Sequence, residues 1–237
     1  MTTPLFPGGV ALSDLAVYDW LASDGTCGGS PHVHTASSEG YLVSAGSGRV
    51  QTLSRDGAAD YSLTPGEVLW FSPGTVHRLM NESNLALTVV MQNSGLPEAG
   101  DAVLTFPAAV LDDPEAYAAA ARLPAGREEE RAAAARVRRD LAVAGYLELR
   151  DEMERNDRAL AAFHDRAARL VRHRVREWQQ LWESTVAAET ERTRRQFVAL
   201  SRGDRGIMAD AAVVRAEPNP GPRAFGMCGR LATWQGF

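Results

Sequence analysis

The chain has 237 residues, a formal net charge of −5 and an apolar fraction of 45%, with charges of both signs mixed along it. This length is enough for one large domain, or two small ones, around a real hydrophobic core. Nucleic-acid-binding domains usually carry a basic excess, so the charge balance argues against that class of protein. We therefore expect a soluble globular protein.

Membrane and secretion signals are not found in the sequence. A membrane-spanning helix needs at least about 18 apolar residues in a row, and the amino-terminal stretch lacks the basic-then-apolar layout of a signal peptide. We expect a cytoplasmic protein that does not contact a membrane. Cys27 and Cys228 are too few for a disulfide framework and are expected to be reduced thiols packed as small hydrophobic side chains.

Lysine is missing from the chain, because every one of the 25 basic residues is an arginine. Lysine supplies the amine for side-chain Schiff bases, for pyridoxal-phosphate anchoring and for Walker-type phosphate loops. These chemistries are therefore excluded.

The first part of the chain, residues 10–106, has the pattern of antiparallel strands. Short apolar runs are separated by turn residues every eight to twelve positions, with turns at Gly46-Ser47-Gly48, Asp56-Gly57 and Pro65-Gly66. Regular spacing of this kind predicts a β-barrel or β-sandwich.

The composition then changes twice, which divides the chain into three parts. Residues 108–205 are rich in alanine, arginine, glutamate and leucine and are predicted to be a helical block. Residues 206–237 return to a strand-like pattern after a bend rich in proline and glycine. We expect residues 1–107 to form a barrel to which 206–237 add strands, so that the helices are an insertion.

Helix boundaries in the block are indicated by capping and breaking residues. Asp112 or Asp113 followed by Pro114 is a good helix start, and Gly126 and Gly145 are expected stops. The acidic and basic run after Gly126 is expected to be a solvated helix face.

The stretch from 146 to 202 contains no glycine or proline and has an amphipathic helical period. A single helix of that length would span roughly 85 Å, which exceeds the diameter of a domain of this size. We expect it to break near Asn156-Asp157 and to pack in a homodimer through Trp178, Leu181 and Trp182.

Two of the five histidines stand one residue apart, at His32 and His34. In a strand these side chains point the same way, while Val33 points the other way. Glu39 can begin the next strand on the same interior face, and His77 can begin another. Three imidazoles and one carboxylate suit iron, manganese, nickel, zinc or copper, and leave two positions of a six-coordinate metal open. The alternative is a polar strand face that binds a sugar without metal.

These residues resemble the two motifs of the cupin superfamily. The first motif runs from Gly29 through His32-x-His34, four residues, Glu39, six residues and Gly46. The second contains Gly66, Pro73-Gly74, two residues, His77, three residues and Asn81. The proline directly precedes Gly74, whereas the usual pattern separates the two by one residue. That departure affects a turn and leaves all four ligand positions intact.

The resemblance covers about residues 10–106 and implies a fold, a cofactor and an assembly. The fold class is mainly β with an α-helical block, namely a cupin-type double-stranded β-helix (jelly-roll barrel) of six to eight strands plus a helical insertion. The metal ligands would be His32, His34, Glu39 and His77, and the cofactor a divalent transition metal of unknown identity. The resemblance also implies that a homodimer is frequent.

Tyr41 is the candidate catalytic residue. If Glu39 points inward, so does Tyr41, which places a phenol beside the metal. The phenol could donate a hydrogen bond, act as an acid, or simply fill the barrel. A bulge of one residue would exchange Tyr41 for Leu42. The other histidines, His164 and His173, are expected to be solvated helix residues.

Two functional hypotheses follow. The first is a metal-dependent enzyme acting on a small oxygenated metabolite, sugar-derived or of the enediol or hydroxy-ketone type, that chelates the metal. Its chemistry would be isomerisation, elimination as in a lyase, or dioxygenation, because fold does not choose among them. The second is a non-catalytic ligand-binding or sensor protein in which the helices relay the presence of a ligand.

Overall fold

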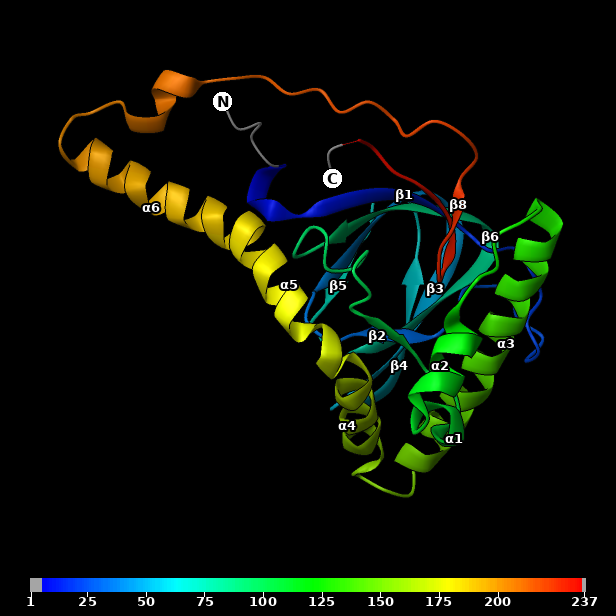
Figure 1. Cartoon of the computed structure of the whole chain (residues 1–237). Helices are drawn as coiled ribbons and strands as arrows, with labels where there is room; N and C mark the ends of the chain where they lie inside the picture. Colours follow the sequence, from blue (N-terminus) through cyan, green and yellow to red (C-terminus); the bar gives the residue numbers. More distant parts are fainter. Residues whose placement is uncertain (1–5, 236–237) are drawn as a thin grey trace.

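The computed structural model of the chain describes residues 6–235. The strands in this part of the chain are β1 (Ala11–Val17), β2 (His32–His34), β3 (Glu39–Ser54), β4 (Gly57–Leu63), β5 (Val68–Phe71), β6 (Val76–Met91), β7 (Ala102–Leu104), β8 (Ala224–Phe225) and β9 (Gly229–Ala232). The helices of residues 108–201 come between β7 and β8 in the chain, and no strand interrupts them. The molecule is therefore a β-barrel with a helical block, as predicted (Figure 1).

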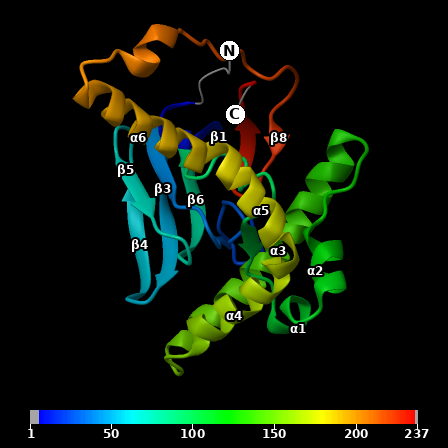
Figure 2. The ribbon, with the colours of Figure 1, turned by 60° about the vertical axis from the view of Figure 1, so that its left-hand side comes forward.

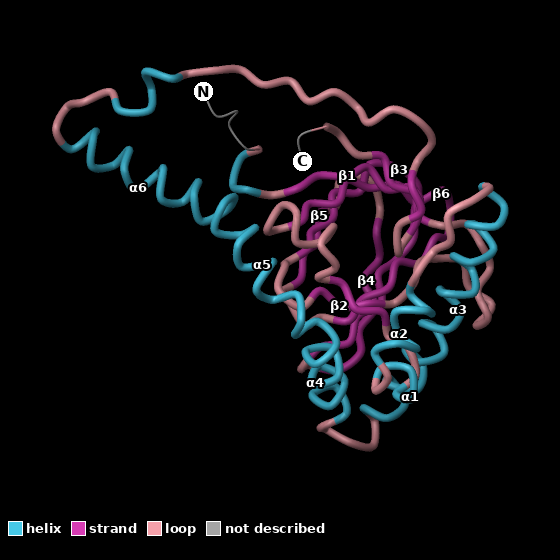
Figure 3. The backbone as a smooth tube through the Cα atoms, in the orientation of Figure 1, coloured by secondary structure: helices cyan, strands magenta, loops and turns pink. Residues whose placement is uncertain are grey.

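The strands belong to one antiparallel sheet that curls around an interior (Figure 3). Its main path runs β4-β3-β6-β1-β9-β8, while β5 pairs with β3, and β2 pairs with both β6 and β7. Strand β9 pairs with β1 between Asp14 and Val17, so the carboxyl-terminal segment adds strands to the sheet built by the amino-terminal part.

The two long strands, β3 and β6, connect the halves of the barrel. Their pairing shifts register near Gly46, where the strands bend. Gly46 has a φ of +73°, and a Cβ at this position would lie 2.2 Å from the carbonyl oxygens of Ser83 and Asn84. Only glycine fits this bend without strain.

The helices are α1 (Ala108–Leu111), α2 (Pro114–Ala121), α3 (Glu128–Met153), α4 (Ala159–Val171), α5 (Val175–Trp182) and α6 (Ala188–Ser201). A short 3₁₀ turn, Arg172–Arg174, joins α4 to α5, and a π-helical turn, Glu183–Ala187, joins α5 to α6. Helices α3 and α4 lie against the barrel, and α6 reaches beyond it (Figures 1 and 2). The chain then returns in an extended course to β8 (Figure 1).

Strand alternation gives the sheet two apolar faces, each with its own core. The inner core fills the barrel and includes Leu15, Tyr41, Val50, Leu79 and Leu87. The outer core lies between the sheet and the helices and includes Val33, Leu53, Val76, Phe106, Tyr146, Phe163 and Trp178. The helical block therefore covers the outer face of the strands that carry the predicted ligands.

Two of the predicted helix boundaries are confirmed. Asp113 caps α2, since its carboxylate accepts hydrogen bonds from the backbone N–H groups of Glu115 and Ala116. The long helical stretch breaks between α3 and α4, where the Asn156 side chain accepts a hydrogen bond from the backbone N–H of Arg158.

The predicted stop at Gly145 is wrong, because this residue lies in the middle of α3. A Cβ there would lie 2.2 Å from the carbonyl oxygen of Thr105. The glycine is needed for close approach of the helix to the segment after β7, which a pattern of breaking residues does not distinguish from a helix end.

One residue of the predicted dimer patch, Trp178, packs within the chain and is not available for a dimer contact. Trp178 is 6% exposed and donates a hydrogen bond from Nε1 to the carbonyl oxygen of Ala99. Leu181 contacts Gly95, and Trp182 stays 42% exposed. The homodimer itself stays a prediction.

The charged run on α3 is not entirely a solvated face, contrary to expectation. Arg138 and Arg139 are buried. The Arg139 guanidinium donates hydrogen bonds to the carbonyl oxygens of Trp20 and Leu21, both at 2.7 Å. Arg139 therefore fastens the helix to the segment after β1, whereas Arg138 donates to the carbonyl oxygens of Ala121 and Gly226. No sequence period distinguishes these two arginines from exposed ones.

No helix among residues 6–235 combines the length and the apolar character needed to cross a bilayer.

A buried ion pair fastens the loop after β1 to β6. The Arg78 guanidinium is fully buried and donates to both carboxylate oxygens of Asp24 and to Thr26 Oγ1. Burial raises the pKa of Asp24, but the hydrogen bonds from Arg78 and Thr26 outweigh it and lower that pKa from 3.8 to about 2. The carboxylate therefore stabilises the fold in its charged form.

We predict that Asp24→Asn lowers the free energy of unfolding at pH 7 by about 3 kcal/mol, because it leaves a buried guanidinium without its counter-ion. A carboxyl with a lowered pKa contributes stability above its unfolded pKa and loses it as the pH falls through the folded value. The difference between variant and parent should therefore shrink between about pH 4 and pH 2. Urea unfolding of the metal-free protein across this range measures it, with the exposed Asp19→Asn as control. A pH-independent difference would contradict the assignment.

Candidate metal centre

The structure brings the four predicted metal ligands together inside the barrel. His32 and His34 lie on β2, Glu39 begins β3 and His77 lies near the start of β6, where it pairs directly with His32. One potential ligand atom from each of the four residues lies within 4.8 Å of the others, and all four residues are buried. Directly paired residues of antiparallel strands project to the same face, which explains why His32 and His77 meet.

Each imidazole presents Nε2 to this cluster and Nδ1 to an acceptor outside it. His32 Nδ1 lies 2.9 Å from the Ser30 carbonyl oxygen, and His77 Nδ1 lies 3.0 Å from that of Thr75. A carbonyl oxygen can only accept, so these contacts assign the proton to Nδ1 and leave a lone pair on Nε2. This is the arrangement of metal-ligating histidines, whose second nitrogen donates to a neighbouring acceptor.

The inward-facing atoms are too close together to be stable without a cation or a shared proton. His32 Nε2 and His77 Nε2 lie 3.1 Å apart, and Glu39 Oε2 lies 2.9 Å from His77 Nε2 and 3.2 Å from His34 Nε2. Lone pairs and a carboxylate that face one another in a buried space repel unless positive charge lies between them. The donor set therefore fits a divalent transition metal.

The electrostatics of the cluster favour the deprotonated ligand forms at two positions. Burial, followed by the neighbouring His77 and His34, lowers the pKa of His32 well below its usual value. Burial raises the pKa of Glu39, but the imidazoles of His77 and His34 outweigh it and hold that pKa well below its usual range. A neutral imidazole and an ionised carboxylate are the forms that bind a metal.

Asp101 is a residue beside the cluster that the sequence analysis missed. Its fully buried carboxylate accepts hydrogen bonds from the backbone N–H groups of Thr35, Ala36 and Ser37, and Oδ2 lies 3.5 Å from His34 Nδ1. Burial lowers the pKa of His34, but Asp101 and Glu39 outweigh it and raise that pKa to about 9. Asp101 thus places a carboxylate oxygen at ion-pair distance behind the His34 ring. Its only signal in the sequence is an acidic residue just before a short strand.

The structure places Tyr41 inside the barrel beside the cluster. Its side chain is 1% exposed, whereas Leu42 is 45% exposed, so the strand parity is the predicted one. The phenol oxygen has no hydrogen-bond partner among the described residues. Burial and then the Glu39 carboxylate raise the pKa of Tyr41 well above its usual value, so the phenol stays a donor.

Cys27 and Cys228 are free thiols, as expected, and Cys228 is buried in the inner core. Burial raises the pKa of the Cys228 thiol, with the Glu39 carboxylate as the next cause. A protonated, buried thiol is a weak nucleophile, so we assign Cys228 a role in core packing and no role in catalysis.

A cavity of about 1090 Å³ lies between β3, β4, β5 and the α3–α4 turn, and two of its lining residues are neighbours of His77. Thr52 and Phe71 line its inner end. Thr52 pairs directly with His77, and the Phe71 ring centroid lies 4.2 Å from that of His77. The outer wall carries polar groups, including Ser54, Arg55, Asp56, Ser72, Asn156 and Asp157.

Comparison with known proteins identifies the family of the barrel. The family model described as "Cupin domain" matches residues 22–92. The chain contains a cupin domain, as the sequence motifs predicted. No curated protein matches the chain.

Solved structures that resemble the cupin domain are distant in sequence. An uncharacterised conserved protein with a double-stranded β-helix domain from Klebsiella pneumoniae is 16% identical, with a TM-score of 0.31; the match covers 38% of this chain and 73% of that one. A cupin protein from Bacteroides fragilis is 18% identical, with a TM-score of 0.27, and the match covers 36% and 65%. An oxalate oxidase in complex with the substrate analogue glycolate is 22% identical, with a TM-score of 0.25, over 36% and 51%.

We predict that His32→Ala and His77→Ala each remove most of the bound metal while the barrel stays folded, because both apolar cores remain. Glu39→Gln should weaken metal binding less, since its amide carbonyl oxygen can still coordinate. Elemental analysis of the purified variants measures the stoichiometry, and circular dichroism checks the fold. His173→Ala, on the turn between α4 and α5, is the matched control. Full metal content in either barrel variant would show that the ligand assignment is wrong.

Asp101→Asn should lower the affinity for metal by about 10- to 100-fold, because an amide cannot replace a carboxylate as the acceptor for His34 Nδ1 while serving three backbone donors. Competition with a chromophoric chelator for Zn²⁺ gives the affinity. The control is Asp165→Asn on the exposed surface of α4. An affinity equal to that of the parent would mean that Asp101 stabilises the loop without orienting the ligand.

Proposed function

We propose that this chain is a metal-dependent cupin enzyme that acts on a small oxygenated metabolite, such as a sugar derivative, an enediol or a hydroxy-ketone. The observation that carries the proposal is the set of inward-facing Nε2 atoms and one carboxylate oxygen, held on one inner face of the barrel. Four protein ligands leave two positions of a six-coordinate metal for a substrate that offers two neighbouring oxygens.

The approach to the site supports a polar substrate. The cavity that reaches Thr52 and Phe71 has hydroxyl, carboxylate, amide and guanidinium groups in its wall, which can hydrogen-bond to a hydroxylated molecule. Beside His77 the wall carries the Phe71 ring together with the Thr52 side chain.

A divalent transition metal held by these residues would supply Lewis acidity, or redox chemistry with dioxygen if it is iron or copper. The chain itself supplies orientation and a proton donor. Ser30, Thr75 and Asp101 fix the three imidazole rings. The buried hydroxyl of Tyr41 has no hydrogen-bond partner within residues 6–235, so a substrate oxygen that accepts its hydrogen bond would relieve the cost of that burial. We propose Tyr41 as the residue that donates to the reacting oxygen.

The competing function is a non-catalytic ligand-binding or sensor cupin. It would use the same ligands, and the helical block that packs on the outer face of β2 would respond to occupancy. Turnover discriminates the two functions, because a sensor binds its ligand and returns it unchanged.

The test is reconstitution of the metal-free chain with Fe²⁺, Mn²⁺, Ni²⁺, Zn²⁺ or Cu²⁺, followed by assay against a panel of ketoses, enediols and hydroxy-ketones. Oxygen uptake reports dioxygenation, and product analysis reports isomerisation or elimination. Tyr41→Phe should reduce kcat by about 100-fold and leave metal content unchanged. Tyr146→Phe, a buried tyrosine of the outer core, is the control. Saturable binding of panel members without any turnover would favour the sensor, and absence of both would contradict the proposal.

A further inference from the structure

A second cavity lies on the opposite side of β2 from the metal ligands. It has a volume of about 690 Å³ and lies between the outer face of the barrel and the helical segment α4–α5. Val33 and Thr35, which alternate with His32 and His34 along the chain, line its sheet side. The volume is in the range of about 300–1,000 Å³ typical of small-molecule sites.

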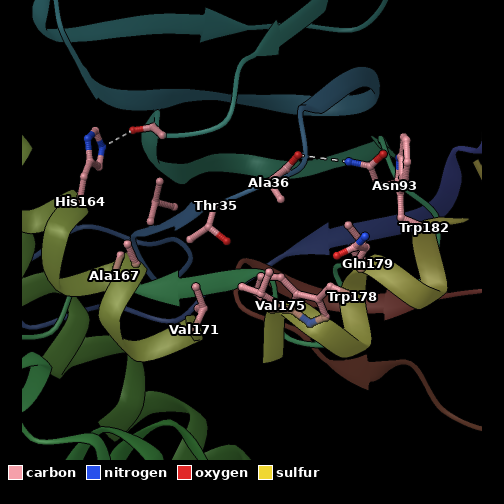
Figure 4. Close-up of a pocket in the computed structure, with 14 residues that line it drawn as sticks. Thr35, Ala36, Asn93, His164, Ala167, Val171, Val175, Trp178, Gln179 and Trp182 are labelled. Atoms are coloured by element: carbon pink, nitrogen blue, oxygen red, sulfur yellow. Dashed lines mark hydrogen bonds between the residues drawn. The ribbon is translucent and has the colours of Figure 1, made fainter. Parts of the chain in front are cut away.

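The helix side of this cavity is almost entirely apolar. Val171, Val175 and Trp178 face the sheet along one stripe, and Trp182 stands at one end beside Asn93 (Figure 4). Close packing leaves few voids larger than a water molecule between a helix and a sheet. A space of this size bordered by two indole rings is therefore suited to an apolar occupant.

None of the residues that line the cavity carries a fixed charge. They are Val33, Thr35, Ala36, Gly74, Asn93, Leu96, His164, Ala167, Ala168, Val171, Val175, Trp178, Gln179 and Trp182. The same helical segment carries several arginines, and none of them is among the lining residues. Without a counter-charge in the wall, a charged ligand would gain no ion pair in exchange for the hydration that it gives up against the apolar surface. The occupant is therefore uncharged.

The polar groups of the wall include acceptors for a ligand that donates a hydrogen bond. His164 Nε2 lies 2.7 Å from the carbonyl oxygen of Gly74, which assigns the proton to Nε2 and leaves Nδ1 as an acceptor (Figure 4). Asn93 Nδ2 donates to the Ala36 carbonyl oxygen, and Gln179 Nε2 donates to Glu183. The carbonyl oxygens of both amides remain for a ligand that donates one hydrogen bond.

We propose that this cavity is a second binding site, which takes an uncharged aromatic molecule with a hydroxyl or N–H donor, and that its occupancy changes the metal affinity of the barrel. The ring system would lie against the two indoles, and its donor would reach His164, Asn93 or Gln179. The binding site stands on the cavity itself. The coupling to metal rests on the metal centre proposed above.

The coupling follows from what the two cavities share. Gly74 and His164 line both, so their hydrogen bond is part of the wall between them. The N–H of Gly74 also donates to the carbonyl oxygen of His34. On the sheet side, Thr35 donates from both its N–H and its hydroxyl to Asp101, whose carboxylate lies at ion-pair distance behind the His34 ring. A ligand that moves Thr35 or His164 therefore acts on a metal-binding imidazole through one intermediate residue.

The binding test uses the metal-free chain, so that the barrel site cannot take the probe through a metal. Calorimetric titration compares 2-naphthol and indole with the anionic 2-naphthoate, and quenching of tryptophan fluorescence gives an independent readout. We expect saturable 1:1 binding of at least one uncharged probe, with 2-naphthoate weaker by tenfold or more. Failure of both uncharged probes, or equal binding of the anion, would overturn the site.

A substitution that introduces a charged side chain into the cavity wall tests whether the probe binds there. Ala168 lines the cavity from an exposed position on α4, so Ala168→Glu should leave the fold intact and weaken binding of the uncharged probe by tenfold or more. Ala133→Glu makes the same change on the exposed surface of α3 and should have no effect. Unchanged binding by the Ala168 variant would place the probe elsewhere and overturn the site.

The coupling has its own measurement. The affinity for Co²⁺ is measured by its visible absorption spectrum, with and without saturating 2-naphthol, in the parent and in Ala168→Glu. A change of threefold or more in the parent only supports the coupling. If the probe binds and the Co²⁺ affinity does not move, the coupling is overturned and the site remains. If the parent binds no Co²⁺ at all, the proposed metal centre fails, and the probe titration still decides the second site.

Discussion

Three imidazole nitrogens and a carboxylate that face one another in a buried space form the constraint on which the rest of the structure depends. His32 and His77 bring Nε2 atoms to 3.1 Å, a separation that is unfavourable without positive charge between them. The protein holds the rings in place through their Nδ1 atoms, which contact the carbonyl oxygens of Ser30 and Thr75 and the carboxylate of Asp101. The barrel provides these anchors because the segments that lead into β2 and β6 supply backbone carbonyl groups, and a loop folds around Asp101.

Strand alternation then separates two environments across the width of one strand. On β2, the histidines face the interior of the barrel, while Val33 faces the outer core and the helical block. The inner side is rich in lone pairs and suits a cation. The outer side is apolar and is covered by α3, α4 and α5. Any movement of β2 therefore displaces side chains on both faces, because they are attached to the same backbone.

The helical block is attached by features that its amphipathic period does not reveal. Gly145 permits close approach of α3 to the chain after β7, and Arg139 fastens the same helix to the segment after β1. Trp178 packs against the barrel and donates a hydrogen bond to Ala99. From the sequence, the glycine predicted a helix stop, the arginine a solvated surface and the tryptophan a dimer contact. Each prediction failed because the deciding partner is far away in the chain.

The sequence by itself determined the barrel, the cluster of His32, His34, Glu39 and His77 that could hold a metal, and the helix boundaries near Asn156 and Asp113. These features depend on local spacing: period-two alternation aims His32, His34 and Tyr41 at one face, and capping residues end helices wherever they stand. Only the tertiary structure decided that Asp101 lies behind the His34 ring, that the long helical stretch packs on its own barrel, and that a cavity lined by Trp178 and Trp182 lies behind β2. Those features arise from contacts between segments that are distant in sequence, and the spacing of residues along the chain does not predict such contacts.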